Sequence, residues 1–122
     1  GAGSLPMSGT IKTFVKNNHL LVGDAAGMVL PSNGAGITIA MIGGRIAGQV
    51  ISEHINEGID LSDYEKRWEN QMGNVMRNSK RAFTLGSVMF RLPDWALNLS
   101  FNRLTKGFIW RAITCRNMFW LF

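Results

Sequence analysis

The stretch from Leu20 to Ile51, LLVGDAAGMVLPSNGAGITIAMIGGRIAGQVI, constrains the fold of this chain more than any other part of it. It begins with a short apolar run that fits a buried strand, and it continues into an acid-bearing turn, GDAAG. A loop with Pro31 follows, and then a long helix begins among residues that have almost no side chains. This order predicts a strand, a turn, a loop and a helix that together form a ligand site.

The GDAAG turn has the composition of a site for a polar ligand. Asp24 offers a carboxylate that accepts hydrogen bonds from ligand hydroxyls. Gly23 and Ala25 on either side of it carry nothing larger than a methyl group, so a ligand can touch the backbone there.

The helix after the loop is predicted from Gly34 to Asn56, with Ser32 or Asn33 as its cap and a C-terminal glycine, Gly58, as its end. Its first turn has no Asp or Glu, so the free N–H groups of that turn are available to a negative charge on a ligand. Arg45 lies either on the solvated face or against a ligand phosphate. Small residues recur along the helix every four positions, which predicts that a sheet or another helix approaches closely: Gly36, Ala40, Gly44 and Gly48.

GDAAG, followed by P-x-x-G-x-G-I and a helix of small residues, resembles the second flavin-binding motif of FAD-dependent oxidoreductases of the aromatic hydroxylase-like superfamily. The likeness is greatest to the geranylgeranyl reductases. The resemblance implies an α/β FAD-binding fold, in which the Asp holds the ribityl chain of FAD and the Pro loop and helix start lie against the isoalloxazine ring. The cofactor-binding residues that it implies are Gly23, Asp24, Ala25, Pro31, Gly34, Ala35, Gly36 and Ile37.

The motif of that family that binds the ADP half of FAD, G-x-G-x-x-G after a strand, does not occur in this sequence. We therefore expect the C-terminal portion of a larger flavoenzyme, inactive alone, whose partner is the missing N-terminal half or another subunit. Residues 1–58 would form the FAD-motif segment and residues 59–122 a helical, basic and aromatic segment. The expected structure is mostly helical, with short strands near Ser4 to Ser8 and His19 to Val22.

A second helix is predicted after the first. Ser62 and Glu65 have the S-x-x-E spacing of a capping box, and the helix is expected to continue toward Leu92, where Pro93 ends it. Apolar residues recur every three or four positions on its first half, which indicates one buried face: Tyr64, Trp68, Met72, Val75 and Met76.

The excess positive charge lies in the second half of the chain. Beyond Asn70 there are eight Lys and Arg against Asp94 alone, which favours an anionic partner. The tail from Phe108 to Phe122 interleaves aromatic residues with Arg, so we expect it to pack on another domain or subunit, as in an oligomer, or to contact a membrane. No nucleic-acid motif is present, and the lone Cys115 excludes an internal disulfide.

Composition sets the remaining limits. The hydrophobic share of 46% is that of a folded chain. The apolar run from Ile37 to Ile51 is shorter than the ~20 residues of a spanning helix, and no secretory signal is visible. His19 and His54 have no partners at metal-ligand spacing, so no metal site is predicted. We expect a cytoplasmic protein that binds peripherally at a membrane.

Three functions remain open from the sequence. The resemblance implies part of a flavin-dependent reductase that saturates isoprenoid, geranylgeranyl double bonds of a lipid or lipid precursor, with a polyprenyl lipid as substrate. Another FAD-dependent monooxygenase or dehydrogenase has the same motif. A catalytically inert module that binds a membrane or a partner is the alternative of a different class. No residue stands out as a catalytic acid.

Overall fold

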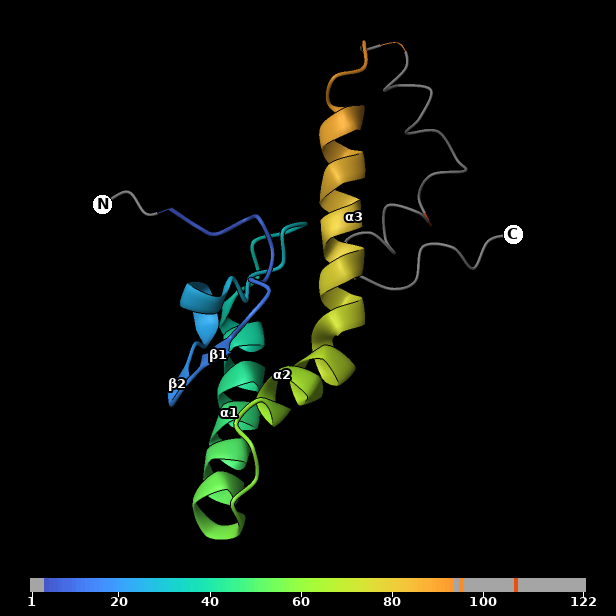
Figure 1. Cartoon of the computed structure of the whole chain (residues 1–122). Helices are drawn as coiled ribbons and strands as arrows, with labels where there is room; N and C mark the ends of the chain where they lie inside the picture. The colour runs from blue at the N-terminus through green and yellow to red at the C-terminus, as the bar shows by residue number, and fades with distance from the viewer. Residues whose placement is uncertain (1–3, 94, 96–106, 108–122) are drawn as a thin grey trace.

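The computed structural model describes residues 4–93, 95 and 107 (Figure 1). The elements in chain order are β1 (Val15–Lys16), β2 (His19–Leu20), the 3-10 helix η1 (Gly23–Ala26), α1 (Ile37–Glu57), α2 (Asp63–Trp68), the π-helix η2 (Glu69–Gly73) and α3 (Asn74–Met89). The chain is therefore mostly helical with two short strands, as the sequence predicts.

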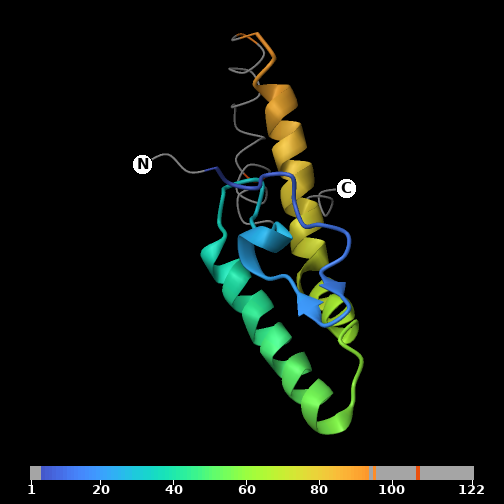
Figure 2. The same cartoon turned by 60° about the vertical axis from the view of Figure 1, so that its left-hand side comes forward.

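The helices form a hairpin. Figure 1 shows α1 running to one end of the molecule and α2, η2 and α3 returning from it as one nearly continuous helical run. Figure 2 shows the same hairpin from the side, with η1 against α1. Gly58 ends α1 in a left-handed conformation, φ 72°, and its N–H donates to the His54 carbonyl oxygen at 3.1 Å. The predicted glycine end of this helix is confirmed.

The two strands form a short antiparallel hairpin in which Val15 pairs with Leu20. The predicted strand from His19 to Val22 therefore ends at Leu20, two residues early. The predicted strand from Ser4 to Ser8 is wrong, because that segment has no strand conformation and Met7 begins a turn. Pro6 has no N–H to donate to a ladder, and no described strand lies beside the segment to accept pairing.

The core lies between the strands, α1 and α2. Phe14 of the loop before β1 packs on Tyr64 and Trp68 of α2, with ring centroids 5.9 and 6.0 Å apart. Tyr64, Trp68, Met72 and Met76 are buried and Val75 is half-buried, so the predicted buried face of the second helix is confirmed. From α1 the buried residues are Ile39, Gly43, Ile46, Ala47 and Val50.

The predicted capping box at the start of α2 is wrong. Ser62 is the N-cap of α2, but its side chain makes no cap bond. The Glu65 carboxylate instead accepts the backbone N–H groups of Phe14 at 2.6 Å and Val15 at 3.1 Å. Glu65 thus joins α2 to the start of the strand hairpin, and these tertiary bonds from Phe14 and Val15 take the place of the local cap.

Arg67 joins the far end of α1 to α2. Its guanidinium donates to both carboxylate oxygens of Glu53, at 3.0 and 2.5 Å, and to Asp63 at 2.7 Å. The hydrogen bonds from Arg67 lower the pKa of the Glu53 carboxyl. Because the Arg67 and Glu53 side chains are partly exposed, their paired hydrogen bonds fix the geometry of the helical hairpin more than they add stability.

The small residues of α1 do not all serve close packing. A Cβ added at Gly43 would lie 2.6 Å from the Met28 sulfur and 3.4 Å from the Trp68 ring. At Gly44 and Gly48 an added Cβ would meet nothing within 4 Å. Within the described part of the chain, Gly44 and Gly48 therefore face outward, whereas close approach occurs at Gly43 and at Gly36, where an added Cβ would lie 3.2 Å from the Val29 side chain.

This difference between neighbouring glycines gives a test of the packing. We expect Gly43→Ala to destabilise the fold by about 1–3 kcal/mol, because the buried Met28 side chain and the Trp68 ring occupy the space that the new methyl group needs. Gly44→Ala should stabilise it by up to ~1 kcal/mol, because alanine favours the helix and meets no neighbour. Unfolding in denaturant measures both changes, and equal shifts in the same direction would contradict the packing described.

Burial of Tyr64 predicts a dependence of stability on alkaline pH. Desolvation raises the pKa of the Tyr64 phenol from 10.0 to about 12, and its hydroxyl donates to the Leu21 carbonyl oxygen at 3.4 Å. The neutral phenol is favoured in the folded state, so the stability that it contributes is present below pH 10.0 and is lost as the pH rises toward about 12.

The chain has a single tyrosine, so tyrosinate absorbance follows Tyr64 alone. We expect the pH midpoint of tyrosinate formation to be higher in the folded chain than in the denatured chain. Tyr64→Phe should remove this contribution to the loss of stability at alkaline pH. Equal midpoints in the folded and denatured chains would show that the phenol is not held neutral by burial.

Candidate functional site

The GDAAG segment forms η1, a short 3-10 helix, where the sequence predicts a turn directly after a strand. The Gly27 N–H donates to the Asp24 carbonyl oxygen at 2.9 Å, and the Met28 N–H donates to that of Gly23 at 3.0 Å. These bonds close η1 on itself, so the Asp24 side chain is left exposed on its outer surface.

The Pro loop, which we define as residues 30–36, is closed by its own hydrogen bonds. The Leu30 carbonyl oxygen accepts the Gly34 N–H at 2.8 Å, and the Leu30 N–H donates to the Ala35 carbonyl oxygen at 2.9 Å. The Asn33 side chain accepts the Ala35 N–H at 3.0 Å. The expected cap of α1 by Ser32 or Asn33 is therefore wrong, because the N-cap is Gly36 and no side chain caps it.

The start of α1 lies beside η1. A Cβ at Gly36 would stand 3.7 Å from an Asp24 carboxylate oxygen and 3.2 Å from the Val29 side chain. The first turn of α1 carries no acidic residue, as the sequence indicates, and Ile37 is 82% exposed. The geometry therefore joins a carboxylate, a bare N-cap and an open helix N-terminus at one place on the surface.

The eight residues implied as cofactor-binding fall into two groups, one near the start of α1 and the other toward α3. Gly23 and Asp24 of η1 meet α1, since an added Cβ at Gly23 would lie 3.6 Å from that of Ala40. Ala25, which follows Asp24, is exposed, and so is Ala35, which precedes Gly36. Gly36 is the N-cap of α1 and Ile37 is its first residue. Pro31 is fully buried, and Gly34 lies toward Leu5 and α3.

A groove of about 430 Å³ runs between the Pro loop and α3. Pro31 and Gly34 line one side, and Phe83, Gly86 and Phe90 line the other. Leu5 and Met7 of the N-terminal segment also contribute to it. Its lining is mostly apolar side chains.

Ser79 of α3 anchors the Pro loop, and sequence reasoning missed it. Its side chain is fully buried, accepts the Ser32 N–H at 3.0 Å, and lies 2.9 Å from the Ser32 hydroxyl oxygen. A signal was available, because Ser79 follows Met72 and Met76 at the spacing of the buried face. A serine in that register indicates a buried hydrogen bond.

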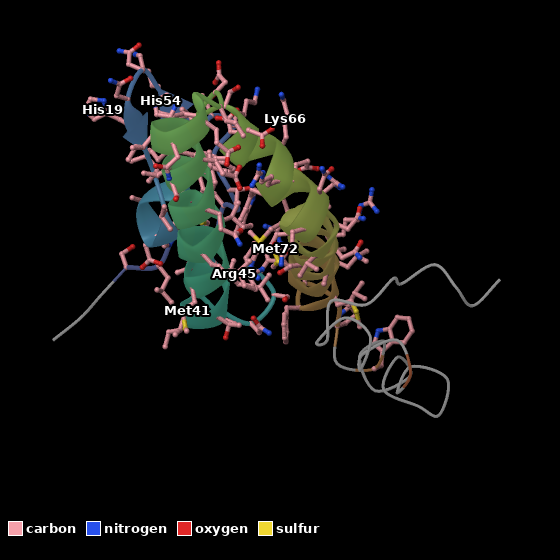
Figure 3. All side chains as sticks on the ribbon, turned by 90° about the horizontal axis from the view of Figure 1, so that it is seen from below. His19, Met41, Arg45, His54, Lys66 and Met72 are labelled. Atoms are coloured by element: carbon pink, nitrogen blue, oxygen red, sulfur yellow. The ribbon has the colours of Figure 1, made fainter. Side chains whose placement is uncertain are left out.

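The charged and histidine candidates lie away from this site. Arg45 donates to the Gln71 side chain at 3.3 Å, and Figure 3 shows it between the helices while Met41 projects from the outer side of α1. His54 donates from Nδ1 to the Ile59 carbonyl oxygen at 2.6 Å, beside the end of α1. In the part of the chain that the structure describes, no group of three metal-ligating side chains occurs.

The aromatic tail from Phe108 to Phe122, which includes Cys115, lies outside the described residues. Among residues 4–93, 95 and 107, no helix is long and apolar enough to cross a membrane.

Several known proteins with similar sequences are named digeranylgeranylglycerophospholipid reductases. The chain is 42% identical over 98 residues to digeranylgeranylglycerophospholipid reductase 1 of Methanococcoides burtonii, a match that covers 76% of this chain and 23% of the reductase. It is 38% identical over 101 residues to digeranylgeranylglycerophospholipid reductase 2 of Methanothermobacter thermautotrophicus, covering 80% of this chain and 26% of that one. A Methanocaldococcus jannaschii protein of uncharacterised function is 49% identical over 106 residues, 86% of this chain and 26% of its own.

No family model and no solved structure matches the chain. It spans about a quarter of the length of the curated relatives. The resemblance that the GDAAG and Pro-loop residues indicate is confirmed by these matches. The chain is thus homologous, over most of its own length, to the digeranylgeranylglycerophospholipid reductases of the geranylgeranyl reductase family.

Proposed function

We propose that the chain forms part of the FAD site of a reductase that saturates the isoprenoid double bonds of a lipid or lipid precursor. The names of the homologous reductases support the substrate class. They favour a reductase over the monooxygenase and dehydrogenase alternatives. With a polypeptide that carries the ADP-binding motif, the chain would complete an α/β FAD-binding fold.

The observation that carries the proposal is the placement of the Asp24 carboxylate beside the bare N-cap of α1. A side chain at Gly36 would fill the space between Asp24 and Val29, so glycine keeps the backbone open to a ligand. Asp24 is exposed, and the first turn of α1 offers N–H groups without a side-chain cap. These residues fit a ligand that has hydroxyl groups at one end and an electron-rich edge at the other.

FAD, when bound, would supply the hydride that reduces a carbon–carbon double bond. Asp24 would accept hydrogen bonds from its ribityl hydroxyls and so fix its position. The N-terminus of α1 would stabilise negative charge at the edge of the ring through backbone N–H groups and the helix dipole. Ile37, exposed at the same end, would cover part of the ring and exclude water. The described residues present no group that we assign as the proton donor.

The surface chemistry supports a lipid substrate. The groove between the Pro loop and α3 is apolar, with Phe83 and Phe90 in its wall. Lys80, Arg81 and Arg91 are exposed on α3 and just after it, where they can meet phosphate headgroups. We propose peripheral contact with a membrane surface on this basis.

A titration of the chain with FAD tests the cofactor site, with binding measured by the quenching of flavin fluorescence. Asp24→Ala removes the acceptor of the ligand hydroxyls, a loss of about 1.5–3 kcal/mol for bonds to a charged group. The Kd for FAD should therefore rise by about tenfold or more. Glu57→Ala is the matched control, because it removes an exposed carboxylate at the opposite end of α1.

Equal loss of affinity in both variants would indicate a general effect of charge and would refute the role of Asp24.

The reductase activity is tested separately. In that assay the chain replaces the matching stretch of the Methanococcoides burtonii reductase, and hydrogenation of digeranylgeranylglycerophospholipid is measured. A chimera that holds FAD but does not reduce the lipid would leave the cofactor site standing and refute the substrate.

A further inference from the structure

One face of α1 is apolar and open. Ile37 is 82% exposed, Met41 70%, Ile51 40% and Ile55 75%. Figure 3 shows Met41 projecting away from the other helices. Together with the two glycines between them, these residues recur at alternating spacings of four and three, which places them on one side of the helix. We call this surface the α1 seam: Ile37, Met41, Gly44, Gly48, Ile51 and Ile55.

The described fold does not account for the α1 seam. The residues with which α1 packs on the core, such as Ile46 and Val50, lie on the opposite side of the helix. Glycine within a helix is unfavourable relative to alanine, yet an added Cβ at Gly44 or Gly48 would meet nothing within 4 Å. A contiguous stripe of exposed apolar side chains is typical of an interaction surface.

The shape of the seam indicates what kind of element covers it. Bulky side chains stand at both ends, and the centre at Gly44 and Gly48 is bare backbone. A helix that crosses there could approach α1 closely, with its own large apolar side chains seated over the glycines. Ile37 and Ile55 would then pack on either side of the crossing.

The length of the homologous reductases indicates a source for such a helix. The chain matches only 23% to 26% of their length, so most of each reductase has no counterpart in it. A second copy of this chain is a poorer occupant, because it also lacks the G-x-G-x-x-G motif that the proposed FAD site requires.

The seam is also continuous with the candidate cofactor site. Ile37 is both its first residue and one of the residues implied in flavin contact, and Gly36 and Asp24 adjoin it. An element seated on the seam would therefore reach the open side of the site, where Asp24, Ala25 and Ala35 are exposed.

We propose that the α1 seam docks an apolar helix of the polypeptide that corresponds to the unmatched length of these reductases, and that this docking closes the FAD site. The inference rests on the proposed function. It assigns Gly44 and Gly48 to the contact between the two parts, and it makes α1 the shared wall of the core and the cofactor site.

The test uses the full chain, co-expressed with the Methanococcoides burtonii reductase polypeptide from which the matching stretch has been removed. Co-purification and the Kd of the pair are measured. Gly48→Leu and Met41→Glu should weaken the pair by at least about tenfold. Gln49→Glu is the control, because Gln49 is exposed beside Gly48 but off the seam. Circular dichroism and thermal unfolding of each free variant show whether it folds.

A further variant separates docking from folding. Gly48→Ala should raise the melting temperature of the free chain, because it favours the helix, and yet weaken the pair, because it fills the crossing point. A purely structural role for this glycine would move both readouts together.

The proposal is overturned if the wild-type chain forms no pair, or if the seam variants bind as well as the control. It is also overturned if the free chain forms a dimer that Gly48→Leu disrupts, since a second copy would then be the occupant. Seam-dependent pairing without retained FAD would uphold the docking surface and refute the proposed cofactor. Retained FAD in a pair that the seam variants do not weaken would uphold the proposed cofactor and refute the docking surface.

Discussion

The structure depends on the close packing of Met28 against Gly43. Met28 is fully buried, and its sulfur accepts the Gly23 N–H at 3.3 Å and lies 3.9 Å from the Tyr64 hydroxyl oxygen. One side chain therefore joins η1, α1 and α2. Only a residue without a Cβ at position 43 lets α1 come this near.

This packing determines what the surface above it can do. Because Met28 fixes η1 on α1, the Asp24 carboxylate is held beside Gly36, at the open end of the helix. Ser79 secures the Pro loop from the other side through Ser32. The candidate site thus combines a rigid support with an exposed polar surface, which is what binding of a polar cofactor requires.

Local patterns predicted much of this arrangement from the sequence. Apolar spacing identified the buried face of α2, and Gly58 identified the end of α1, because both follow from the geometry of a single helix. Contacts between distant residues were not predictable in this way. Glu65 accepts N–H groups about fifty residues away, and nothing local distinguishes that role from a capping box.

The same limit applies to the glycines of α1. Gly43 and Gly44 are neighbours in the sequence with opposite environments, and only the packed neighbours of each reveal the difference. At the candidate site, Asp24, Gly36 and Ile37 of the motif lie together at the start of α1, and their contact with a cofactor stays a prediction. The motif did not foresee that Pro31 is buried and that Gly34 belongs to the wall of an apolar groove.

The most direct test of the account is a map of FAD contacts on the backbone of this chain by NMR. We expect FAD to bind where Asp24 meets the start of α1. Addition of FAD should shift the amide resonances of Asp24 and of Gly36 to Ile39 more than any others, even where binding is weak. Shifts confined to α2 and α3, or none in the first turn of α1 at saturating FAD, would contradict it.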